Sequence, residues 1–124
     1  MKTFSMTDIG RRREMNQDYM YTSETTVGKL PNLFLVADGM GGHKAGEYAS
    51  RFTVESITAS ISDSKQDGTV AILRDAITET NRRLNEEAVH DPSKTGMGTT
   101  IVAATITDRM LHVANVGDSR LYVI

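Results

Sequence analysis

Cysteine is absent from this sequence of 124 residues, and only two prolines and no tryptophan are present. The absence of cysteine excludes disulfides, thiolate catalysis and zinc sites built from cysteine, and it fits a reducing compartment such as the cytoplasm. No segment approaches the roughly 18 consecutive apolar residues that cross a bilayer. The N-terminus also lacks the apolar core of a signal peptide. We therefore expect a cytoplasmic protein without membrane insertion.

The sequence also lacks a large excess of positive or negative charge. The sequence has 14 basic and 16 acidic side chains, for a formal net charge of -2. DNA, RNA and anionic membranes attract proteins with clustered positive charge, so this balance argues against all three as partners. A hydrophobic fraction of 39% in a chain of this length is enough for one domain, although such lengths also occur as halves of larger domains.

Apolar residues repeat with strand-like periods near both ends and with a helical period in between. The predicted strands are residues 3–9, 19–22, 33–37, 99–106, 110–116 and 121–124. The first predicted helix covers residues 45–61. The second begins near residue 69, with Asp67 as its N-terminal cap, and ends at Asp91-Pro92. Asp108-Arg109 is the predicted hairpin turn. This order predicts a layered α+β fold rather than alternating βαβ units.

The segment from Asn32 to His43 is the most informative one. Its apolar run, residues 33–37, has strand length and predicts a strand buried on both faces. Asp38 follows at the end of that strand, and a glycine-rich turn follows Asp38. A buried carboxylate is costly unless a positive group balances it, so a divalent cation is a natural partner.

Four aspartates stand beside predicted strand ends or turns, a common place for solvated acidic residues. Carboxylate, carbonyl and water oxygens are the ligands of Mg²⁺ and Mn²⁺, and two such ions about 3.5 to 4 Å apart can activate water for attack on phosphorus. Asp38 with the Gly39 carbonyl could supply part of such a centre but not all of its negative charge. The four aspartates are Asp8, Asp18, Asp38 and Asp118.

Four motifs, in order, resemble the metal-dependent serine/threonine protein phosphatases of type 2C, especially their small bacterial members. They are Thr7-Asp-Ile-Gly10 with Arg13 and Asn16-Gln-Asp18, the segment from Val36 to Glu47, Gly96-Met-Gly-Thr-Thr100, and Asn115-Val-Gly-Asp-Ser-Arg120. The resemblance implies an antiparallel β-sandwich flanked by helices, with layers in the order α-β-β-α. Residues 1–124 would form the N-terminal portion of that single catalytic domain.

The resemblance also implies roles for individual residues. Asp38 would bridge two catalytic Mn²⁺ or Mg²⁺ ions, and the Gly39 carbonyl would bind one of them. Arg13 would hold the substrate phosphate, and Asp18 would lie near the metal waters. Asp118 would help to bind a third, looser metal, and Gln17, which replaces a glutamate of many eukaryotic relatives, could make only a weaker contact.

Two departures from the family pattern matter. Eukaryotic members often have a histidine directly after Asp-Gly as the proposed acid, and this chain has Met40 there. His43 could replace it, or His43 could be a surface residue at a helix start while a metal-bound water serves as the acid. The other metal carboxylates of the family come from the C-terminal half, which these residues do not include.

The resemblance implies hydrolysis of phosphoserine and phosphothreonine in proteins by a hydroxide that bridges two metal ions. We expect this activity of the parent protein and little turnover from the 124 residues alone. A non-catalytic half-domain that binds a phosphoprotein or another partner is the alternative. A serine/threonine kinase and its substrates are the expected partners, and the exposed sheet edge after Ile124 could support an oligomer.

Overall fold

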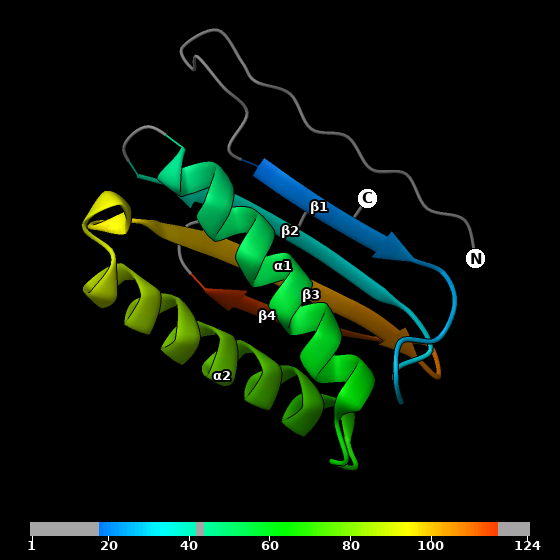
Figure 1. Ribbon diagram of the computed structural model, residues 1–124. Helices are drawn as coiled ribbons and strands as arrows, with labels where there is room; N and C mark the ends of the chain where they lie inside the picture. Colours follow the sequence, from blue (N-terminus) through cyan, green and yellow to red (C-terminus); the bar gives the residue numbers. More distant parts are fainter. Residues whose placement is uncertain (1–17, 42–43, 117–124) are drawn as a thin grey trace, which may run out of the picture.

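The computed structural model describes residues 18–41 and 44–116, which form a four-stranded antiparallel sheet and two helices (Figure 1). The strands follow each other in the sheet in chain order: β1 (Asp18–Ser23), β2 (Leu33–Met40), β3 (Gly98–Thr107) and β4 (Met110–Val116). The helices are α1 (Ala45–Asp63) and α2 (Thr69–His90), followed by a short 3-10 helix, η1 (Pro92–Lys94). This arrangement confirms the predicted α+β class.

The connection between β3 and β4 is a two-residue hairpin turn, as the sequence predicts. Asp108 and Arg109 both have positive φ, 47° and 69°. Two left-handed residues in succession match the right-handed twist of the strands that they join, which is why such turns are common in tight hairpins. The hairpin fixes the register of β4 against β3.

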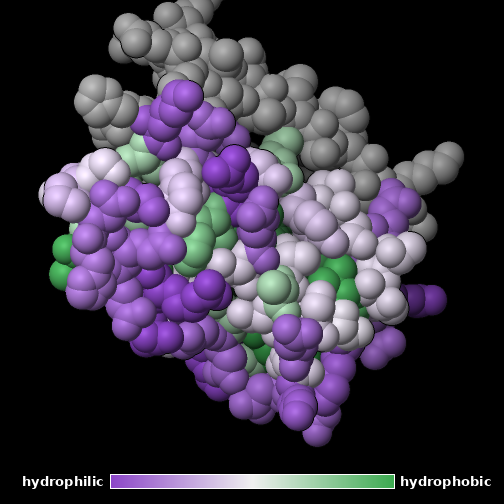
Figure 2. Space-filling model, viewed as in Figure 1, coloured by the Kyte–Doolittle hydropathy of each residue, from purple (hydrophilic) through white to green (hydrophobic). Residues whose placement is uncertain are grey.

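The core lies between the sheet and the helices, which cover the same face of the sheet (Figure 1). Leu33, Leu35 and Ala37 of β2 are fully buried and belong to one apolar cluster with Ile57 and Ile61 of α1. The view onto the helices is mostly hydrophilic (Figure 2). Each helix therefore has one apolar side, which packs on the sheet, and one polar side, which faces water.

Two expectations about local structure are wrong. Asp67 does not cap α2: Gly68 occupies the cap position without a side-chain bond, and Asp67 pairs with Lys29 at 2.9 Å. The run of residues 33–37 is also not covered equally on both faces, because burial alternates along β2 and Val36 is 42% exposed. Only every second side chain of this apolar run faces the helices.

No helix within residues 18–41 and 44–116 combines the length and the apolar character that crossing a bilayer requires. The predicted strands at residues 3–9 and 121–124 lie outside the described residues.

Candidate functional site

Three polar side chains lie side by side across the first three strands. Asp18 of β1 stands directly opposite Asp38 of β2, and Asp38 stands directly opposite Thr100 of β3. Directly opposite residues of antiparallel strands project from the same face, with Cβ atoms about 4.5 to 5.5 Å apart. We call Asp18, Asp38 and Thr100 the polar row.

The polar row lies on the face of the sheet that is turned away from the helices, called here the open face. Leu35 and Ala37 point toward the helices and are fully buried. Because side chains alternate along a strand, Val36 and Asp38 point to the open face. Asp38 is half-buried there.

Thr100 closes the polar row on the side of β3. Its side chain is buried, and its hydroxyl donates a long hydrogen bond of 3.5 Å to the backbone carbonyl of Asp38. In the sequence, Thr100 is recognisable only as part of a strand and of the motif Gly96-Met-Gly-Thr-Thr100. Its place beside Asp38 depends on the β2–β3 register, which the order of residues does not reveal.

The sequence predicts that Asp38 stands at the end of its strand, and this prediction is wrong. Strand β2 continues through Gly39 and Met40, which pair with Thr99 and Gly98 of β3. Asp38 is therefore held by strands on both sides, since it pairs with Asp18 as well, and Gly39 is held by β3. This placement makes the position of the carboxylate more rigid than a loop would.

Gly41 begins the turn and requires glycine. Its φ is +146°, and a Cβ atom there would lie 3.1 Å from the Ala45 Cβ and 3.3 Å from the Met97 Cα. The turn after β2 thus packs directly against the start of α1 and against the segment that leads into β3.

The polar row suits part of a site for a hard cation. Two carboxylates and the Gly39 carbonyl are oxygen donors of the kind that Mg²⁺ and Mn²⁺ bind. Within the described residues, no three His, Cys, Asp or Glu side chains gather as a metal-binding group. The row therefore fits one wall of a metal centre rather than a complete one.

The remaining predicted site residues fall outside the part of the chain that the structure describes. They are Arg13, Gln17, His43 and Asp118. Gln17 immediately precedes β1, and His43 follows β2 by three residues. The structure therefore brings together Asp18, Asp38 and Gly39, and the roles of all seven residues stay predictions.

Comparison with known proteins gives a consistent result. The family model described as protein phosphatase 2C matches residues 9–124. A serine/threonine phosphatase, Stp, of Listeria monocytogenes is 36% identical over 95% of this chain and 48% of its own length. The protein phosphatase PhpP of Streptococcus pneumoniae is 33% identical over 100% of this chain and 50% of its own length.

Solved structures agree with the sequence relatives. The serine/threonine phosphatase Stp1 from Staphylococcus aureus matches with a TM-score of 0.80 and 34% identity, over 93% of this chain and 46% of that chain. The phosphatase PstP/Ppp of Mycobacterium tuberculosis matches with a TM-score of 0.74 and 33% identity, over 91% and 45%. The chain thus spans about half the length of the relatives that it matches.

Proposed function

The chain belongs to the protein phosphatase 2C family, and we propose that the protein hydrolyses phosphoserine and phosphothreonine in other proteins with the help of Mn²⁺ or Mg²⁺. The observation that carries this proposal is the register that sets Asp18 opposite Asp38 on the open face. Carboxylate oxygens are ligands that Mn²⁺ and Mg²⁺ prefer, so two aspartates in directly opposite positions suit a metal centre.

The proposed roles follow from the chemistry of each group. Asp38 and the Gly39 carbonyl would bind metal, Asp18 would lie near the metal waters, and Asp118 would help to bind a third, looser metal. A metal bound by these residues would supply activation of water and neutralisation of phosphoryl charge. Asp38 can hold a fixed position because strands flank it on both sides.

Arg13 would bind the phosphate group of the substrate. A guanidinium donates two parallel hydrogen bonds to a phosphoryl group, which fixes its orientation as well as its charge. The leaving alkoxide needs a proton, and His43 or a water molecule would donate it. Phosphorylated proteins, including the targets of a serine/threonine kinase, are the proposed substrates.

Residues 1–124 would be the N-terminal portion of the catalytic domain. We expect the chain alone to bind metal weakly and to turn over slowly, because the polar row and Gly39 offer few of the oxygen donors that two divalent ions need. In the non-catalytic alternative, the same half-domain would bind a phosphoprotein and never hydrolyse it.

Hydrolysis of a phosphothreonine peptide and of an aryl phosphate with Mn²⁺ tests the proposal. We expect Asp38→Asn to lower kcat/KM by at least about a hundredfold and Arg13→Ala by about tenfold or more. Turnover at about 1 s⁻¹ or faster by the 124 residues alone, abolished by Asp38→Asn, would support the phosphatase assignment and refute the expected weakness of the chain alone. Peptide binding without hydrolysis in the full-length protein would favour the alternative.

A further inference from the structure

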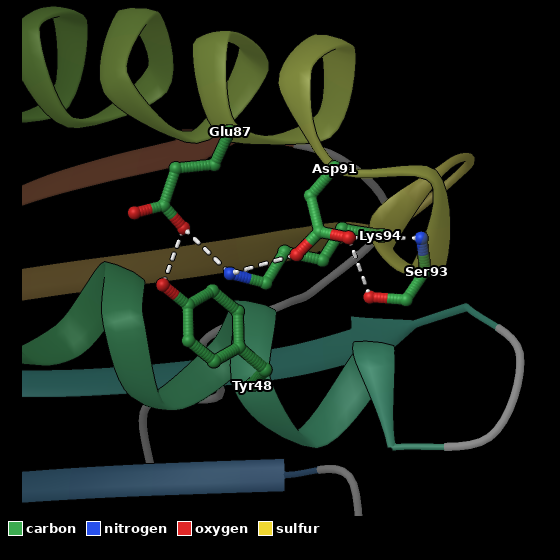
Figure 3. A network of polar contacts seen from close by, with 5 residues as sticks. All are labelled: Tyr48, Glu87, Asp91, Ser93 and Lys94. Carbon is green, nitrogen blue, oxygen red and sulfur yellow. Dashed lines mark hydrogen bonds and ion pairs between the residues drawn. The ribbon is translucent and has the colours of Figure 1, made fainter.

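A cluster of charged and aromatic side chains joins the two helices near the polar-row end of α1 (Figure 3). The Tyr48 hydroxyl of α1 donates a hydrogen bond to Glu87 of α2. The Lys94 ammonium lies 3.4 Å from the same Glu87 oxygen and 3.9 Å from the centre of the Tyr48 ring. We call Tyr48, Glu87 and Lys94 the clamp, since they connect α1, α2 and η1.

Lys94 is the centre of the clamp. Its ammonium also lies 3.7 Å from Asp91, and its side chain is only 24% exposed. Burial and the bond to Glu87 raise the pKa of Tyr48, so the tyrosine hydroxyl stays protonated and remains a donor at neutral pH. A partly desolvated ammonium with two carboxylates and an aromatic face is held more firmly than an exposed ion pair.

The clamp is connected to β2, the strand that carries Asp38, through a short series of backbone contacts. The Met97 amide donates to the Lys94 carbonyl at 3.1 Å, so η1 fixes the residue that packs against Gly41. Directly after Met97, residues 98–100 pair with residues 38–40 of β2. Tyr48 itself lies in the first turn of α1, and its amide donates to the Lys44 carbonyl at 3.0 Å.

We propose that the clamp is a positioning device for the metal centre: Lys94 fixes the segment 95–98 and the start of α1 against the Gly39–Gly41 backbone, and so sets where Asp38 and the Gly39 carbonyl lie. The role in metal binding rests on the proposed function, whereas the contacts of the clamp do not depend on it. Lys94, Tyr48 and Glu87 are positioning residues and do not touch substrate.

The chain offers a matched control at the opposite end of α1. Lys29 also bonds an aspartate, Asp67 at 2.9 Å, and the Lys65 and Gln66 carbonyls at 3.1 Å. Lys94→Met and Lys29→Met therefore each remove one positive charge that is bonded to an acidic residue, one near the end of β2 and one remote from it. Lys94→Arg keeps the charge and the aromatic contact.

Amide hydrogen exchange of the metal-free protein tests the geometry first. We expect Lys94→Met to speed exchange at Gly39, Gly41 and Thr99 by about tenfold, Lys29→Met to leave these amides unchanged, and Lys94→Arg to restore protection. Tyr48→Phe should show a smaller effect of the same pattern, and it serves in place of Lys94→Met if that variant does not fold. Equal effects of Lys94→Met and Lys29→Met, or no effect of the clamp variants, would overturn the proposal.

Titration of the full-length protein with Mn²⁺ then tests the consequence for metal binding. We expect Lys94→Met to weaken Mn²⁺ binding by about tenfold, as is usual when a group that supports a metal ligand is lost, and Lys29→Met to leave it unchanged. Unchanged Mn²⁺ affinity in Lys94→Met would refute positioning while leaving the phosphatase assignment intact. If the unaltered full-length protein binds no Mn²⁺, the proposed function fails, and hydrogen exchange alone decides on the clamp.

Discussion

Gly28 is a residue whose replacement has a predictable cost. Its φ is +58°, and a Cβ atom there would overlap the carbonyl oxygen of Ile61 in α1. We expect Gly28→Ala to lower the free energy of unfolding by more than about 2 kcal/mol, measured by urea denaturation. Gly96→Ala is the control, because Gly96 also has positive φ but no atom within 4 Å of the added Cβ. Equal losses from the two variants would contradict the overlap with Ile61.

Two buried threonines differ in whether their hydroxyls have partners. Within the described residues, the Thr80 hydroxyl has no hydrogen-bond partner, whereas the equally buried Thr105 hydroxyl donates to the Asn32 carbonyl at 2.7 Å. Thr80→Val should therefore stabilise the protein by about 1 kcal/mol, and Thr105→Val should destabilise it by about 1 to 3 kcal/mol. Thermal or urea unfolding gives both signs. A loss from Thr80→Val would mean that its hydroxyl is satisfied after all.

At the residue scale, the sequence predicts the chemical role of a residue better than it predicts which residues lie beside it in the fold. Asp38 stands out because an acidic residue follows an apolar run, which is visible in the order of residues. The partner relations of Asp18 with Asp38, and of Asp38 with Thr100, depend on strand register, which long-range packing decides. Asp67 was predicted as a cap from its position, but the nearby Lys29 offers its carboxylate a charged partner instead.

The end of α2 should respond to pH through Asp91. Hydrogen bonds from Ser93, first from its hydroxyl and then from its amide, hold the pKa of Asp91 below its ordinary value of 3.8. A lowered pKa contributes stability that is present above pH 3.8 and is lost as pH falls through the lower folded value. Asp91→Asn should therefore reduce the melting temperature at pH 7 and reduce it progressively less below pH 3.8. A constant difference across that range would exclude this role.

At the element scale, periodicity predicts most of the described structure. Spacing of apolar residues identifies both helices, and β-branched residues identify β3, because these signals are local. Strand β2 shows the limit of this approach. An apolar run has no period that separates a strand covered on both faces from one covered on a single face, so the exposure of Val36 was not foreseen.

At the scale of the whole molecule, exposed apolar side chains gather on the open face beside the polar row. Their exposed fractions lie between 40% and 52%, and they are Val36, Met40, Ile106, Leu111 and Val113. Apolar groups gathered on one sheet face favour association with a second apolar surface. In the family resemblance described above, a second sheet packs on such a face, which would require residues beyond those described.

Self-association of the 124-residue chain follows from this surface. Size-exclusion chromatography with light scattering should show oligomers at high concentration, and the double variant Val36→Thr, Val113→Thr should show less association. Val70→Thr is the control, because Val70 is 62% exposed but lies on α2. A strict monomer at high concentration, before any substitution, would contradict the prediction.

The polar row as one wall of a metal centre is tested most directly by Mn²⁺ binding to the full-length protein, followed through the loss of the free-ion signal in electron paramagnetic resonance. Asp38→Asn should weaken Mn²⁺ binding at least tenfold, because a neutral amide replaces a charged oxygen ligand of a hard cation. Asp63→Asn, which removes an exposed carboxylate at the far end of α1, should leave binding unchanged. Mn²⁺ binding by Asp38→Asn that equals binding by the unaltered protein would contradict the assignment.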